Sequence, residues 1–227
     1  MKVKNGKSTT ELIMMAAGII LLGSIWGLLE CTLGGVKWGV SGLYVSMGAV
    51  MAGFFGIGFM LLARRLFRFT GSMLLVALVA SIMRLIAPVG VCVLCSAIAI
   101  AVEGAVFEMI LSRRSIHTHL SGGKVLPMIS LGVVSGFAIF VTGYLLTQIL
   151  TPLVTGGPLV MGNVIGIIPL MVGRSFYAAV LGGISVPLIA SLPNPHIYLN
   201  KVNRGAYLTA TTALSVLSWV LVIFVIF

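Results

Sequence analysis

The sequence predicts an all-α membrane protein, a polytopic bundle of six to seven transmembrane helices. Hydrophobic residues make up 59% of the 227 residues and charged residues only 8%, whereas about a quarter of an average soluble domain is charged. A water-soluble protein of this size could not cover its surface with so few polar side chains. The three cysteines are also too few for a secreted disulfide scaffold. An integral membrane protein is the class that remains.

The apolar residues fall in seven runs that approach or exceed the roughly 20 residues a spanning helix needs. We expect the spans at about 12–33, 41–63, 71–87, 91–112, 127–149, 164–191 and 207–227. The capping-box pattern Ser8-Thr9-Thr10-Glu11 marks the start of the first. Prolines and glycines around 155–169 suggest that the sixth begins with a broken or re-entrant piece. Residues 1–227 thus form a single domain, with a core bundle at about 10–191 and an additional C-terminal helix at about 207–227.

The basic residues indicate the orientation of the chain. Eleven of the fourteen Lys and Arg lie in the N-terminal tail or in loops on the same predicted side, against Lys37 alone on the other. By the positive-inside rule the N-terminus is cytoplasmic, in the plasma or inner cell membrane. No contiguous basic patch with interleaved aromatic residues is present, so the net charge of +10 indicates contact with the lipid bilayer and not with nucleic acid.

Four ionisable residues lie deep in the predicted spans. Glu30, Arg84, Glu103 and Arg174 come from four different segments, and such groups usually face a bundle interior and mark a site. Helical periodicity places small or polar residues beside them, which predicts a polar pocket open to the outside. The predicted substrate-binding residues are Glu30, Arg84, Glu103, Arg174, Trp26, Ser96, Tyr144 and Gln148. The alternatives are interhelical salt bridges without a ligand, and aromatic residues that belong to the interfacial belt.

The sequence offers little for enzymatic chemistry or cofactor binding. Cys92 and Cys95 form a CxxC that could be a metal site or a redox pair. A metal needs further ligands, however, and packing of small buried cysteines is the favoured interpretation. The chain has no phosphate-binding loop and no nucleophile–base pair, since its histidines fall in predicted cytoplasmic loops. We therefore expect no cofactor, no catalytic residue and no enzyme.

The stretches Trp26-Gly27-Leu28-Leu29-Glu30 and Val102-Glu103-Gly104-Ala105, within a bundle of this size and topology, resemble the substrate-binding S components of energy-coupling factor (ECF) transporters. The resemblance implies a six-helix core that captures a vitamin or related micronutrient. It also implies a membrane coupling protein and cytosolic ATPase subunits as partners. The chain departs from that family in two respects: alanines do not recur at four-residue spacing on the first helix, and a seventh helix is predicted.

Three functions are compatible with these patterns. The first is a membrane subunit that binds a small-molecule substrate for uptake and is energised by separate ATPase subunits. The second is a self-contained secondary carrier, in which Glu103 would carry a proton. The third is a membrane enzyme or an assembly factor.

Overall fold

The computed structural model describes residues 9–34, 38–40, 43–87, 92–112, 125–158, 161–193, 196 and 202–226. Within them the chain is a helical bundle, as predicted. Among the described residues, six helices are long and apolar enough to cross a membrane. Of the capping box, Ser8 lies outside the described residues, and the first helix begins at Thr9.

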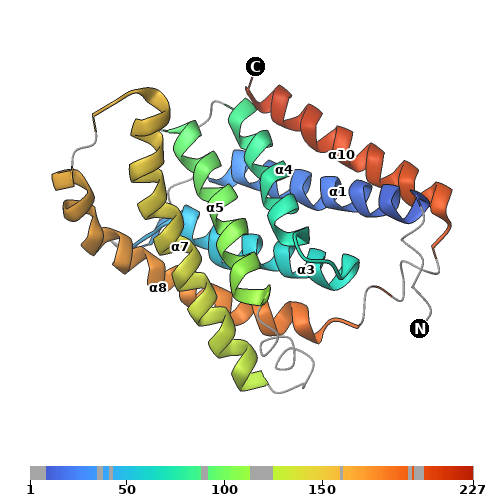
Figure 1. Cartoon of the computed structure of the whole chain (residues 1–227), viewed down its shortest axis with the longest axis horizontal. Coiled ribbons are helices and arrows are strands. Elements are labelled where there is room, and N and C mark those ends of the chain that lie inside the picture. The colour runs from blue at the N-terminus through green and yellow to red at the C-terminus, as the bar shows by residue number, and fades with distance from the viewer. Residues whose placement is uncertain are drawn as a thin grey trace, which may run out of the picture.

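Successive long helices of the described chain run in alternating directions through the bundle (Figure 1). They are α1 (Thr9–Leu33), α2 (Met47–Val50), the π-helix η1 (Met51–Gly56), α3 (Ile57–Phe67), α4 (Ser72–Ile86), α5 (Val93–Ser112), α7 (Val125–Thr155), α8 (Met161–Ser191) and α10 (Arg204–Ile226). The elements α2, η1 and α3 form one continuous span, Met47–Phe67. The seventh apolar helix, α4, has only 15 residues, which agrees with the short third run in the sequence.

A small hairpin precedes this span and was not predicted. Strands β1 (Trp38–Val40) and β2 (Leu43–Val45) pair in antiparallel fashion, with Gly39 opposite Tyr44. The predicted span at 41–63 is therefore wrong at its start, since the helix begins at Met47 and continues to Phe67. The apolar residues of β2 are indistinguishable by hydropathy from the helix that follows, which explains the error.

The expected break in the sixth span is also absent. Residues Met161–Ser191 form one helix that passes through Pro169 and Pro187. The interruption lies earlier, where α7 ends at Thr155: Gly156 adopts φ +69°, and the N–H of Gly157 bonds to the carbonyl of Pro152 at 2.9 Å. This is a Schellman-type end, in which a glycine takes the left-handed conformation and satisfies the last helical carbonyls.

The closest backbone contacts in the bundle join α7 to α8. A Cβ added at Gly136 would collide with the backbone of Ala178, and one at Gly132 with that of Gly182. Both helices thus present small residues at four-residue spacing, the arrangement that lets membrane helices approach closely.

The C-terminal helix packs on the outside of the bundle, along α1 (Figure 1). Trp219 Nε1 donates a hydrogen bond to Ser24 Oγ at 2.9 Å, and Val222 is buried against Cys31 and Met83. On the opposite flank α8 exposes Phe176, Val180, Ile184 and Leu188 at four-residue spacing. Such apolar stripes suit contact with lipid tails.

The alternation of helix directions gives the bundle two ends. We call the end at Leu33, Met47, Ile86, Val93 and Thr155 the cavity end. We call the opposite end, at Phe67, Ser72, Ser112, Val125 and Ser191, the Arg64 end.

Candidate functional site

A polar cavity of about 380 Å³ lies at the cavity end, between α1, α2, α5, α7 and α8. This volume falls in the range of small-molecule sites, roughly 300–1,000 Å³. Among the side chains on its wall are those of Glu30, Ser46, Ser96, Glu103, Phe140, Tyr144, Thr147, Gln148 and Arg174. Six of the eight predicted substrate-binding residues therefore line one cavity, although they come from four helices.

Glu103 is the most deeply placed acid of the cavity. It lies about midway along α5 and is only 6% exposed. Its Oε2 atom is buried and has no hydrogen-bond partner among the described residues. Gly143 on α7 leaves room beside it, because a Cβ there would lie 3.5 Å from Glu103 Cγ. A carboxylate oxygen buried without a donor is costly, so this group is suited to a ligand or a proton.

Glu30 and Arg84 form the second charged part of the site. Glu30 lines the cavity from α1, and the Arg84 guanidinium on α4 lies close enough to interact with it electrostatically. Arg84 is buried behind the cavity wall, where its Nε donates a hydrogen bond to Ser96 Oγ at 2.9 Å. Ser96 in turn donates to the carbonyl of Val93 at 2.9 Å. Arg84 therefore supports the wall and balances the charge of Glu30.

Arg174 supplies the positive charge on the cavity wall. It is half-buried on α8. All four glutamates of the chain lie within the described residues, and none of them forms an ion pair with Arg174. Of the four deep charges, Glu30, Glu103 and Arg174 thus line the same cavity, as predicted. Glu103 and Arg174 do not form a salt bridge with each other.

The aromatic and amide residues behave differently from one another. The rings of Phe140 and Tyr144 stack on α7 with centroids 6.2 Å apart, and both line the cavity beside Gln148. Trp26 does not line it: its side chain is fully buried in the core, against Gly56 of the π-helix. The indole fits there because Gly56 has no side chain. The helical periodicity of the sequence does not show which residue of another helix lies opposite Trp26.

Several wall residues were missed by the sequence analysis. Thr147 lies on the face of α7 that carries Tyr144, so the helical periodicity that placed Tyr144 at the pocket also indicated Thr147. Ser46 and Gly48 come from the start of the second span, which the sequence analysis placed too early. Phe140 reads as an ordinary apolar residue of a spanning helix, and only the three-dimensional arrangement reveals its role.

Cys92 and Cys95 are joined by a disulfide at the cavity wall. Both are half-buried, and Thr151 Oγ1 donates a weak hydrogen bond to Cys95 Sγ at 3.6 Å. The favoured interpretation of the pair as packed cysteines is wrong: Cys92 immediately precedes α5 and Cys95 lies in its first turn, with their Cα atoms 5.3 Å apart. In the oxidised state they have no thiolates for a metal. Across the described residues, no three His, Cys, Asp or Glu side chains cluster as metal ligands.

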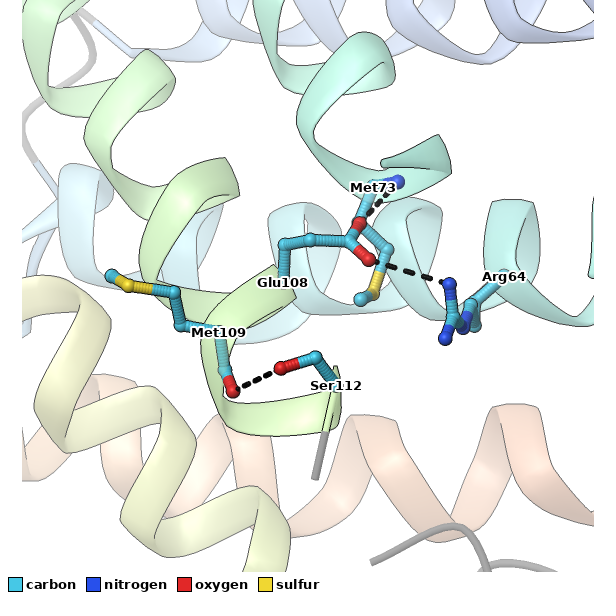
Figure 2. Close-up of polar contacts among 5 residues, drawn as sticks. All are labelled: Arg64, Met73, Glu108, Met109 and Ser112. Carbon is cyan, nitrogen blue, oxygen red and sulfur yellow. Dashed lines mark hydrogen bonds and ion pairs between the residues drawn. The ribbon is translucent and has the colours of Figure 1, made fainter. Parts of the chain in front are cut away.

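At the Arg64 end, polar contacts among the described residues join neighbouring helices. Figure 2 shows Glu108 between two donors: its Oε1 lies 3.3 Å from Arg64 Nη1, and its Oε2 accepts the backbone N–H of Met73 at 3.1 Å. Glu108 thereby caps the start of α4. On the neighbouring side Arg65 donates to the carbonyls of Ile189 and Leu192 at the end of α8.

No protein-family model, curated protein or solved structure matches the chain. Its chemistry has to be inferred from the arrangement of its own side chains.

Proposed function

We propose that this chain is a membrane-embedded subunit that binds a small solute for uptake. The observation that carries the proposal is the cavity of about 380 Å³ inside a membrane bundle, whose wall includes the unpaired carboxylate oxygen of Glu103 and the cation of Arg174. Ionisable groups at membrane depth usually belong to a solute or ion pathway. The cavity lies at one end of the bundle, which fits entry of the solute from that side.

The direction and energy source follow from the sequence patterns. The positive-inside rule turns the cavity end outward, so the solute enters from outside the cell. Because the chain carries no phosphate-binding loop, we assign ATP hydrolysis to separate cytosolic subunits joined through a membrane coupling protein. The likeness to ECF S components supports this arrangement and favours a vitamin or related micronutrient as the solute.

The proposal can be tested by gentle detergent extraction of the full chain from its native membrane. Mass spectrometry should find a retained small molecule together with a membrane partner and ATPases. The variant Ala99→Phe places a ring in the cavity and should lose the small molecule while keeping the proteins. Its control, Ala213→Phe, adds the same ring to an exposed position of α10 and should retain both. A wild-type chain that retains no solute contradicts the proposal.

A self-contained, proton-coupled carrier is the second candidate, and the buried Oε2 of Glu103 favours it. Reconstitution of the purified chain in liposomes separates the two. Accumulation of the solute by the chain alone, driven by a proton gradient and lost in Glu103→Gln, would establish the carrier and reject the ATPase-dependent subunit. Binding of the solute without transport would reject the carrier and support the ATPase-dependent subunit.

A further inference from the structure

The cavity holds two opposite charges that remain unpaired with each other. Glu103 is fixed on α5 and Arg174 on α8, and both side chains line the same space without an ion pair between them. Glu30 also acts electrostatically on Glu103, and the Arg84 guanidinium opposes the charge of Glu30 from behind the wall. The described wall is therefore close to neutral overall, with one separated negative and one separated positive group.

This arrangement discriminates among ligands by charge. In a partly dehydrated site, a charge that loses water without gaining a partner is costly. A ligand with only a cationic group would satisfy Glu103 and leave Arg174 unmatched, and an anionic ligand would do the reverse. A net-neutral ligand that carries both charges satisfies both residues at once.

The remaining wall determines the rest of the ligand. Ile100, Phe140 and Tyr144 present an apolar surface in the same cavity, so the body that joins the two charges can be apolar or aromatic. The Arg174 guanidinium suits an oxyanion, either carboxylate or phosphate, because its planar fork can donate two parallel hydrogen bonds. Glu103 only accepts when ionised, so it requires a donor such as a protonated nitrogen.

We propose that the ligand of this cavity is a small zwitterion whose protonated nitrogen binds Glu103 and whose carboxylate or phosphate binds Arg174. The inference rests on the proposed function and narrows its substrate to one charge class. The volume of the cavity alone does not predict the charges of its ligand, whereas the separated Glu103 and Arg174 do.

The test uses the purified full chain in detergent micelles, dialysed against the water-soluble small-molecule extract of its expression host. After washing, mass spectrometry identifies the retained compounds, and their formulae show whether the anion is a carboxylate or a phosphate. We expect retained compounds to carry both a basic nitrogen and one of these oxyanions. The identified compound is then compared with an analogue that lacks the nitrogen and one that lacks the oxyanion, and each should bind at least about tenfold more weakly.

Paired variants assign each charge to its residue. Glu103→Gln should lose the preference for the compound over the analogue that lacks the basic nitrogen. Arg174→Gln should lose the preference over the analogue that lacks the oxyanion. Glu11→Gln and Arg204→Gln remove the same charges at exposed positions and should keep both preferences. Elution profiles in size-exclusion chromatography show whether each variant is folded.

The outcomes separate the two proposals. Retention of a singly charged or uncharged solute overturns the zwitterion and leaves the solute-binding function standing. The same conclusion follows if an anionic solute binds the Glu103→Gln variant as tightly as it binds the wild type, because Glu103 then binds no cationic group of the ligand. Failure to retain any solute overturns both.

Discussion

Two glutamates on the same helix, five residues apart, show how the two ends of this bundle differ. Glu103 and Glu108 are both more than nine-tenths buried on α5. At the Arg64 end, Glu108 accepts from a guanidinium and a backbone N–H, so both of its oxygens have partners. In the cavity, Oε2 of Glu103 has no partner among the described residues. The same residue type therefore joins neighbouring helices at one end and leaves an unsatisfied group at the other, as expected where function is maintained at some cost in stability.

The largest effect expected is that of Glu108→Ala. The change leaves Arg64 and the N-terminus of α4 without their shared acceptor. Breaking a fully buried ion pair from one side costs about 3–5 kcal/mol, and we expect a loss toward the lower end because the Arg64 side chain is 17% exposed. Thermal unfolding in detergent micelles, followed by loss of the monodisperse elution peak, measures the effect. Glu108→Gln should destabilise less, because an amide oxygen still accepts from Met73. Equal losses for both variants would mean that the ion pair with Arg64, which both variants lose, accounts for the effect and that the bond from Met73 adds little.

A second change tests whether close helix contact holds the cavity wall. Gly136→Val places a branched side chain against the backbone of Ala178, so α7 and α8 must separate. We expect a loss of at least about 1–3 kcal/mol, the usual cost of overpacking, measured by denaturant unfolding. Gly166→Val is the matched control, since no described atom lies within 4 Å of a Cβ at that position. Similar losses of stability in both variants would mean that replacing a helical glycine is itself destabilising, and that the contact between α7 and α8 is not the cause.

A smaller effect is expected behind the cavity wall. Ser96→Ala removes the oxygen that accepts from Arg84 Nε, and we expect a loss of about 1–3 kcal/mol for a buried charged donor left with one partner fewer. Thermal unfolding again measures it. Ser130→Ala, on an exposed hydroxyl of α7 that bonds only to its own helix, should be close to neutral.

The smallest effect has the opposite sign and is the sharpest test of the comparison. Glu103→Gln replaces a buried carboxylate by a neutral amide, so the ligand-free protein should unfold at an unchanged or slightly higher temperature, a gain of up to about 1 kcal/mol. Glu108→Gln should lower that temperature. If both changes destabilise equally, Glu103 has a structural partner and the contrast between the two ends disappears.

The sequence was sufficient for the class of fold and for the deep charges. Long apolar runs predict helices because backbone groups in lipid have to bond within their own segment. Buried charges stand out against such runs, and Glu30, Glu103 and Arg174 indeed share one cavity. Periodicity assigns a residue to a face of its helix and does not show which neighbour lies opposite. That limit explains the misplacement of Trp26, which fits against Gly56, and of Arg84, which lies behind Ser96.

Helix ends were the least predictable features for a similar reason. Hydropathy does not separate a short apolar hairpin from the helix after it, and prolines do not break a helix when surrounding helices support it. The start of α2 and the continuity of α8 therefore differ from the prediction. The Cys92–Cys95 disulfide depends on how the two cysteines are oriented at the start of α5, which composition does not encode.

The brevity of α4 has a consequence for the surrounding lipid. Its 15 residues extend for about 22 Å, against a hydrocarbon core of about 30 Å. Leu75, Leu78 and Ile82 are exposed along it, so acyl chains meet this helix directly. A helix shorter than the hydrocarbon core is accommodated by local thinning of the bilayer, by snorkelling of flanking side chains or by association with a partner. Since α4 carries Arg84, we expect acyl-chain length to bear on the position of the guanidinium that opposes the charge of Glu30.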